Sequence, residues 1–230
     1  MAKIDSHVSN QNLRTPRAAA IAGIFFALLF STSYTLIQIS IPALSYGSVN
    51  WLENQADTLI LGLSLLPFAG IAFLWFLGVV RDRMGYLEDQ FFSTLFLGSG
   101  ILYIGLVFVA AAFAGGTIAA YALEPELLAD NIVLLLSRMI INQVITVYAI
   151  RMAGMFMIVL GTIWIRTMLM PKWLTFITFI FALILIISIG FTHWVILIFP
   201  AWVLLISAYI LYLNFLIKTD KIQIDGLTME

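Results

Sequence analysis

The sequence predicts an all-α integral membrane protein, a bundle of six transmembrane helices with both termini in the cytoplasm. Three observations lead to this fold class. The composition is 63% hydrophobic and only 10% charged, which is far from that of a soluble globular domain. Six apolar stretches are each long enough to cross a hydrocarbon layer of about 30 Å, which takes roughly 20 helical residues. The Lys and Arg residues also cluster on one side of a chain that threads back and forth through a bilayer.

The six predicted spans are separated by short polar segments. They cover residues 18–44, 58–80, 93–122, 146–168, 173–192 and 194–217. Residues 1–17 are polar, and we expect a flexible cytoplasmic tail there, with a second cytoplasmic tail at 218–230. The first span is too long for the apolar part of a cleavable signal peptide and has no clear cleavage site after it. We therefore expect it to remain as a transmembrane helix.

The basic residues set the expected orientation. Nine of the eleven Lys and Arg residues lie on one side of the threaded chain. These nine are Lys3, Arg14, Arg17, Arg81, Arg83, Arg166, Lys172, Lys218 and Lys221. Because Lys and Arg are enriched in cytoplasmic loops, both ends of the chain are expected in the cytoplasm.

Small residues recur along the first three spans and predict close helix packing. Ala19, Gly23 and Ala27 are spaced four residues apart in the first span, so they share one helix face. Gly70 in the second span and Gly116 in the third belong to similar stripes. In lipid, such stripes let two helix backbones approach closely. We expect these faces to be buried between helices.

Residues 131–147 leave two structures open. They mix apolar side chains with Arg138, Asn142 and Gln143, which form a polar patch about one helical turn long. An amphipathic helix lying in the membrane interface fits this pattern, and so does an outward extension of the fourth span. The polar patch is either a solvated interfacial face or the mouth of a site on the outer surface.

The last two predicted spans are joined by a very tight turn. Gly190, Thr192 and His193 are the residues of this connection. Because the connection is so short, the fifth and sixth spans are expected to be antiparallel neighbours.

Arg151 is the most conspicuous single residue, because it falls within the fourth span. It lies fifteen positions before Arg166, so a rise of 1.5 Å per residue places it roughly 22 Å from the inner interface. A charged Arg at the bilayer centre costs about 2.5–3.5 kcal/mol. No acidic residue lies deep in any span. Its possible partners are outer-loop carboxylates, backbone carbonyls, a lipid phosphate or another subunit, so it is either a structural, snorkelling residue or a recognition site for an anion, a lipid or a protein.

The segment 78–85 contains a short sequence pattern. It runs Gly, three residues with Arg81 last, then Asp82, Arg83, one residue and Gly85. This resembles the loop signature between the second and third spans of major facilitator transporters. The resemblance implies that Asp82 caps and clamps helices during alternating access and that Gly85 permits a tight turn. The alternative is a short cytoplasmic loop in which the arginines follow the positive-inside rule and Gly85 ends a helix.

Two longer segments carry a second resemblance. Residues 74–100 and 151–173 resemble segments of uncharacterised bacterial polytopic membrane proteins. This resemblance implies a location in the bacterial inner membrane and implies no particular activity.

Several kinds of chemistry lack their residues in this sequence. There is no cysteine, and the two histidines, His7 and His193, have no neighbouring ligands at metal-binding spacing. The Ser residues of the spans lack a basic partner, and no pair of carboxylates is buried in the membrane. No basic run with interleaved aromatic residues is present. We therefore expect no enzyme activity, no metal, no cofactor and no nucleic-acid partner.

Two functions remain from the sequence alone. The first is a non-catalytic accessory or structural subunit that packs with partner subunits, or with itself, and with the lipid bilayer. The second is a small homo-oligomeric transporter, channel or solute-binding component that recognises an anion or a lipid through Arg151. The nearly unbroken apolar spans favour the first, because a polar permeation path needs lining groups that replace water.

Overall fold

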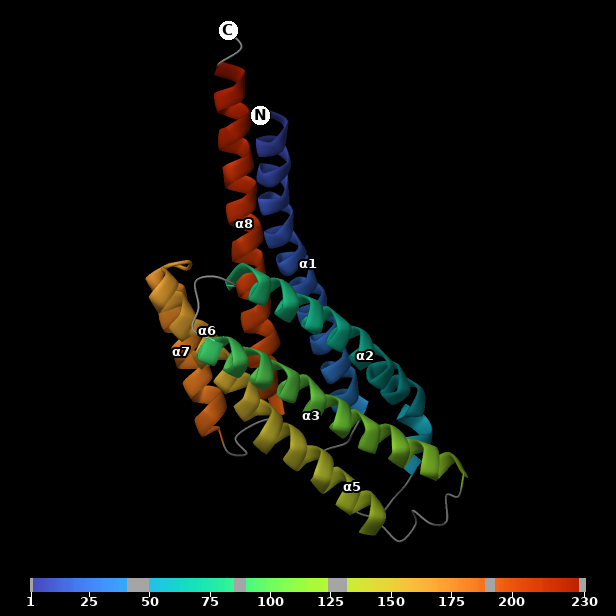
Figure 1. Cartoon of the computed structure of the whole chain (residues 1–230). Coiled ribbons are helices and arrows are strands. Elements are labelled where there is room, and N and C mark those ends of the chain that lie inside the picture. The colour runs from blue at the N-terminus through green and yellow to red at the C-terminus, as the bar shows by residue number, and fades with distance from the viewer. Residues whose placement is uncertain (1, 41–49, 85–89, 124–131, 189–192, 228–230) are drawn as a thin grey trace.

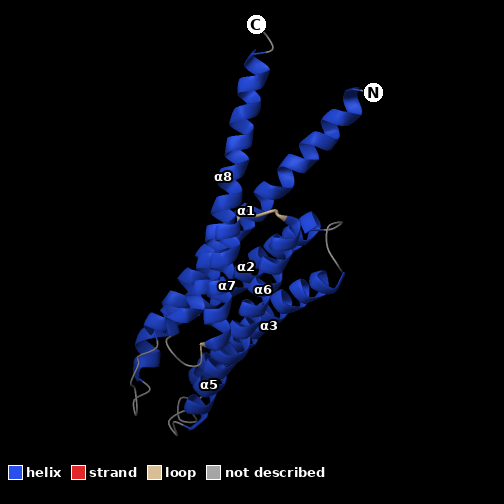
Figure 2. Cartoon of the chain, turned by 90° about the vertical axis from the view of Figure 1, so that its left-hand side faces the viewer, coloured by secondary structure: helices blue, strands red, loops and turns tan. Residues whose placement is uncertain are grey.

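The computed structural model describes residues 2–40, 50–84, 90–123, 132–188 and 193–227 of the chain (Figure 1). Within these ranges the structure is helical almost throughout and contains no strand, which confirms the predicted all-α class (Figure 2). The α-helices are α1 (Ala2–Ser40), α2 (Asn50–Met84), α3 (Gln90–Leu123), α5 (Ile132–Gln143), α6 (Ile150–Thr167), α7 (Lys172–Ile187) and α8 (Ile198–Leu227). A π turn, η1 (Val144–Ala149), joins α5 to α6, and a 3-10 turn, η2 (His193–Leu197), precedes α8.

Five helical stretches are long and apolar enough to cross a membrane. They are Ala18–Ser40, Gln55–Asp82, Gln90–Leu123, Ile132–Thr167 and Trp194–Asn214. The sixth apolar helix, α7, has 16 residues. At 1.5 Å per residue it is about 24 Å long, somewhat less than the hydrocarbon thickness of a typical bilayer. By length and composition, five helices of the described chain could thus cross a membrane, and α7 is a shorter apolar helix.

The helices differ from the predicted spans mainly at their ends. α1 begins at Ala2, so residues 2–17 continue the first helix instead of forming a flexible segment, and α8 likewise continues through Leu227. Residues 132–143 run through η1 into α6, so they continue the helix of the predicted fourth span. The last residues of the predicted first and fifth spans, 41–44 and 189–192, lie outside the described residues.

The bundle is built from a small set of helix pairs. α1 packs along α2 and α8, α3 packs along α6, and α6 packs along α7, while α5 and η1 lie against α3. α7 also contacts α8. In this pair, Thr178 faces Trp202 and Trp173 faces Tyr209. The earlier residue of α7 contacts the later residue of α8, so α7 and α8 are antiparallel neighbours.

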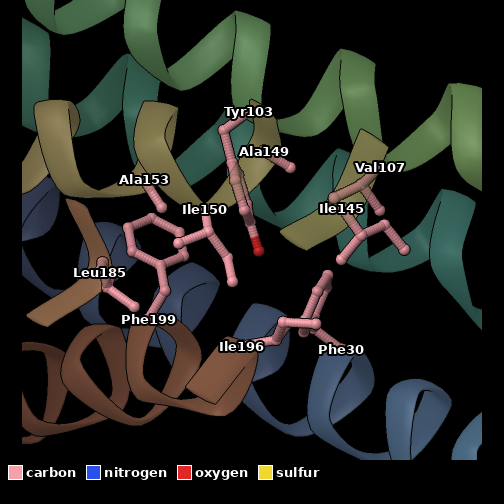
Figure 3. A pocket seen from close by; sticks show the side chains of 10 residues that line it. All are labelled: Phe30, Tyr103, Val107, Ile145, Ala149, Ile150, Ala153, Leu185, Ile196 and Phe199. Atoms are coloured by element: carbon pink, nitrogen blue, oxygen red, sulfur yellow. The ribbon is translucent and has the colours of Figure 1, made fainter. Parts of the chain in front are cut away.

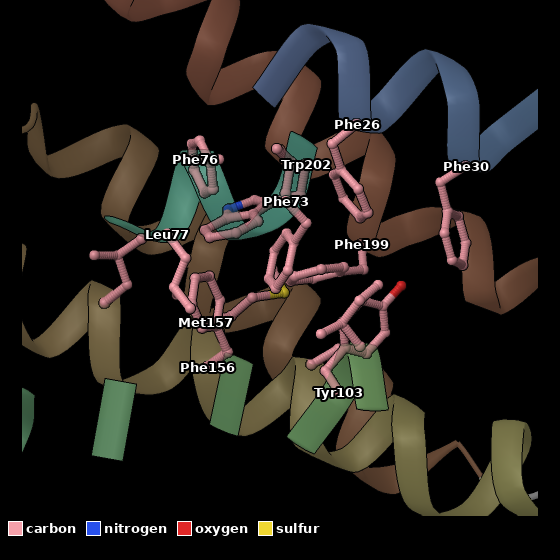
Figure 4. Close-up of a cluster of buried hydrophobic side chains, with 14 of the residues drawn as sticks. Phe26, Phe30, Phe73, Phe76, Leu77, Tyr103, Phe156, Met157, Phe199 and Trp202 are labelled. Atoms are coloured by element: carbon pink, nitrogen blue, oxygen red, sulfur yellow. The ribbon is translucent and has the colours of Figure 1, made fainter. Parts of the chain in front are cut away.

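Aromatic side chains fill the centre of the bundle (Figure 4). The rings of Tyr103 and Phe199 are 4.6 Å apart, and those of Phe26 and Phe73 are 4.8 Å apart. Phe156 joins the cluster through contacts to both Phe73 and Phe199. Such ring pairs contribute about 0.5–1.5 kcal/mol each beyond the burial of area. Because lipid removes most of the hydrophobic driving force between helices, close packing of this kind holds the bundle together.

Candidate functional site

The candidate site is a small internal cavity that contains the hydroxyl group of Tyr103 (Figure 3). Tyr103 lies in α3 and is 3% exposed. Its Oη has no hydrogen-bond partner within the part of the chain that the structure describes. An unpaired buried hydroxyl carries a desolvation cost of about 1–3 kcal/mol. Among the described residues it is one of two buried side-chain polar atoms without a partner, the other being Ser207 Oγ.

The cavity lies where five helices and both short turns approach one another. Its lining side chains are apolar apart from the Tyr103 hydroxyl, and its volume is about 10 Å³. The complete lining comprises Phe30, Tyr103, Val107, Ile145, Ala149, Ile150, Ala153, Leu185, Ile196 and Phe199. The site can hold a group of the size of one water molecule, and it offers no charge to compensate an ion.

The π turn η1 forms one wall of this cavity. Ile145 and Ala149 of the turn both line it. The backbone N–H of Ile150 donates to the carbonyl of Ile145, five residues earlier, which is the hydrogen-bond pattern of a π turn. Single π turns inside α-helices occur frequently at functional sites. The cavity and the irregular backbone thus coincide.

Arg151 is the second residue of α6, and its side chain is hydrogen-bonded to the π turn η1. Its Nη1 donates a hydrogen bond of 2.6 Å to the carbonyl oxygen of Val147. The side chain is half-buried and does not line the cavity. Of the partners considered from the sequence, the structure therefore supplies a backbone carbonyl of Arg151's own helix. The planar guanidinium carries five N–H groups, and the bond to Val147 O uses one of its two Nη atoms.

The polar patch on α5 is separate from the cavity. Arg138, Asn142 and Gln143 all have exposed side chains, and none of them lines the cavity. They share one continuous helical stretch with Arg151. Near them, the hydroxyl groups of Ser137 in α5 and Thr117 in α3 are hydrogen-bonded to each other, which ties α5 to the end of α3.

The residues of the 78–85 segment lie at the end of α2. Arg81 and Asp82 are exposed on its last turns. Arg83 is helical, and its side chain is outside what the structure describes; Gly85 lies outside the described residues. The cavity at Tyr103 has no lining residue from this segment.

The small residues of the predicted packing stripes occupy different environments. Ala19 and Ala27 are buried. A Cβ atom at Gly23 would overlap Ser207 Oγ of α8 and lie 3.0 Å from a ring carbon of Phe76 in α2. A Cβ at Gly70 would overlap the Phe108 ring of α3, whereas one at Gly116 would meet nothing within 4 Å. α1 and α2 thus use their glycines for close approach, and the Gly116 position is open.

A second, larger hollow lies on the outside of the bundle. This groove, between α2 and α3, is lined by Leu63, Leu66, Pro67, Phe108, Ala111 and Ala112 and has a volume of about 350 Å³. Pro67 lies inside α2 and has no N–H to donate to the carbonyl of Leu63, which bends or loosens a helix locally. The groove is apolar and open to the surroundings of the bundle.

Comparison with protein-family models, with curated proteins and with solved structures gives no match. The candidate site therefore stands on its own geometry. Among the described residues, no group of three His, Cys, Asp or Glu side chains could hold a metal ion.

Sequence reasoning singled out Arg151 and missed Tyr103. The available signal was a tyrosine in the middle of an otherwise apolar span, because a buried tyrosine hydroxyl usually finds a hydrogen-bond partner. The π turn had no comparable signal. Val144–Ala149 is an ordinary apolar stretch with two β-branched valines and an isoleucine, and its composition does not distinguish a π turn from an α-helix.

Proposed function

We propose that the chain crosses a bacterial inner membrane six times, with both termini in the cytoplasm. Two contacts support a common inner end for the helices. Arg166 Cζ lies 4.4 Å from the centre of the Phe92 ring, so the end of α6 lies beside the start of α3. The rings of Trp173 and Tyr209, 6.0 Å apart, join the start of α7 to the second half of the apolar stretch Trp194–Asn214. The two chain termini point to the same end of the bundle, as an even number of crossings requires (Figure 1).

The proposed topology needs α7 as its fifth crossing, although α7, with 16 residues, is shorter than the other five apolar helices. Its exposed Trp173 is suited to the membrane interface, where amphipathic aromatic rings are enriched. A short span is accommodated by local thinning of the bilayer at modest cost. The basic residues Arg81, Arg166 and Lys172 then share the cytoplasmic side with the termini.

Cysteine labelling tests this topology directly, since the chain has no cysteine of its own. Leu123 is highly exposed at the outer end of α3, and Asp220 lies beyond the sixth span. In intact cells, a membrane-impermeant maleimide should label Leu123→Cys and should reach Asp220→Cys only after permeabilisation. Labelling of Asp220→Cys in intact cells would place the C-terminal end outside the cytoplasm and contradict the proposed topology.

We further propose that the protein is a non-catalytic subunit that packs with partner membrane proteins and with lipid. One observation carries this proposal: the interior is filled by aromatic rings, while the larger hollow is a groove on the outer surface. A solute path would need polar lining groups and space through the bundle. The internal cavity of about 10 Å³ is far too small for a polar solute or a hydrated ion.

The groove between α2 and α3 is the proposed contact for a partner helix. Its six lining residues are apolar, and its small alanines allow another helix to come close. The experiment is native mass spectrometry after gentle extraction from the native membrane, with Ala112→Trp as the groove variant. Ala120→Trp is the matched control, because Ala120 is exposed on the same helix and does not line the groove.

The expected result is a reproducible heterologous subunit with the wild type and the control, and its loss with Ala112→Trp. A second copy of the chain in place of a heterologous subunit would retain the packing function and make the assembly homo-oligomeric. A complex unaffected by Ala112→Trp would mean that the partner does not bind in this groove. A homo-oligomer that carries a bound solute would instead support the transport alternative.

A further inference from the structure

The Tyr103 hydroxyl is held in place by packing and has no hydrogen-bond partner among the described residues. Its ring contacts Phe199 at 4.6 Å, Phe73 at 5.7 Å and Phe30 at 6.2 Å between centroids. These contacts fix the ring so that Oη points into the internal cavity (Figure 3). The hydroxyl cannot turn toward the bilayer surface without breaking this cluster. It therefore needs a partner that enters the cavity.

The size and lining of the cavity define what this partner can be. About 10 Å³ corresponds to the space that a single water molecule needs. The lining side chains other than Tyr103 are hydrocarbon, so an ion would lose its hydration without compensation. The ligand is thus small, neutral and able to form hydrogen bonds.

A bound water needs at least one polar neighbour besides the tyrosine, and the π turn η1 is the lining element whose backbone departs from α-helical pairing. Ile145 and Ala149 of η1 line the same cavity as Tyr103. The ladder of hydrogen bonds is shifted by one residue in this turn, as the Ile150-to-Ile145 bond shows. Val147 O already accepts from a side chain, that of Arg151. Irregular helix segments of this kind commonly accommodate an inserted side chain or water.

We propose that this cavity is an internal hydration site, in which one water molecule bridges Tyr103 Oη of α3 to the backbone of the π turn η1. This goes beyond the proposed packing function and does not depend on it. The water would join α3 to the fourth span at the point where that span departs from α-helical geometry. Tyr103 is then a ligand-binding residue of the bundle interior and more than a packing element.

A structure of the full-length protein at a resolution that shows ordered water tests the proposal first. The expected result is a water peak within about 2.5–3.0 Å of Tyr103 Oη, a normal O–H···O distance. The second measurement is thermal unfolding of Tyr103→Phe. Loss of the hydroxyl removes the water's partner, so the melting temperature should fall by about 2–4 °C, which is the size of a single lost interaction in a chain of this length.

Tyr212→Phe is the control, because Tyr212 is exposed in α8 and lies outside the cavity. Its melting temperature should equal that of the wild type. A dry cavity would give the opposite result: no water peak and a higher melting temperature for Tyr103→Phe. Any one of these outcomes would overturn the proposal.

Discussion

Trp202 and Thr178 form a buried hydrogen bond between two helices, with Trp202 Nε1 donating to Thr178 Oγ1 over 2.8 Å. Both side chains are fully buried. The threonine hydroxyl in turn donates to the carbonyl of Leu174, 2.9 Å away in its own helix. The Thr178 hydroxyl thus accepts the indole N–H and also has an acceptor for its own hydrogen. This bond joins the short helix α7 to α8, whereas α7 otherwise packs mainly along α6.

Thr178→Val should destabilise the protein because it leaves the buried indole N–H without an acceptor. The expected cost is about 1 kcal/mol, between the average for interhelical bonds in membranes and the penalty for an unpaired buried donor. Thermal unfolding in detergent should show a melting temperature lower by about 2–4 °C. Thr162→Val is the control, since its hydroxyl bonds only the carbonyl of Ile158 in its own helix. Equal stabilities of the two variants would mean that the indole finds another acceptor.

Gly23→Ala should weaken the contact of α1 with α2 and α8. The added methyl group would overlap Ser207 Oγ and press on the Phe76 ring. Overpacking of this kind typically costs about 1–3 kcal/mol. Gly116→Ala, at an open position, should leave the unfolding temperature unchanged.

Ser207→Ala provides the matching test of the same contact. Ser207 Oγ is buried without a hydrogen-bond partner among the described residues, so its removal alone should be neutral or slightly stabilising. Combined with Gly23→Ala, it should restore part of the lost stability, and the double-mutant cycle should give a coupling of about 0.5–3 kcal/mol. Simple additivity would show that the Phe76 ring, and not Ser207, sets the cost.

The fold class could be predicted because length, hydropathy and the positions of Lys and Arg are local properties of the sequence. The interior could not, because lipid-facing and buried positions are both apolar. In α3, Tyr103 is buried while Phe113, on the same helix, is 44% exposed, and no polar face separates them. Helical periodicity identifies a buried face in water, where the other face must be polar. In a membrane this contrast is missing, so the aromatic cluster emerges only from packing.

The candidate site shows the same division. Arg151 could be singled out because a charge in an apolar span is conspicuous, but its bond to Val147 O depends on the π turn. Likewise, the short connection expected at 190–193 correctly indicated that α7 and α8 are antiparallel neighbours, while the length of α7 had to come from the structure.

Arg151→Leu should reduce the recovery of partner subunits while leaving the fold intact, because the guanidinium carries N–H donors beyond the one bonded to Val147 O and these could bind a partner. The variant loses one hydrogen bond to Val147 O, an interaction that the α-helical backbone can replace by regular pairing. It also loses the charge, which lowers the cost of inserting the span by about 2.5–3.5 kcal/mol. Native mass spectrometry measures partner recovery, and Arg151→Lys keeps the charge as a control. Equal recovery with the wild type, Arg151→Leu and Arg151→Lys would mean that Arg151 binds no partner and serves only the bond within its own helix.

Thr117→Cys combined with Ser137→Cys should form a disulfide between α3 and α5. The two hydroxyls are hydrogen-bonded to each other, so the Sγ atoms that replace them would lie side by side. In the proposed topology this end of α3 and α5 lies on the oxidising outer side of the membrane, which favours formation in the cell. Non-reducing electrophoresis after cleavage between residues 123 and 132 measures it: the two fragments should remain joined, and each single variant should separate. Separation of the double variant would mean that α5 leaves α3 and lies along the membrane surface, because a helix in the interface would carry Ser137 away from Thr117.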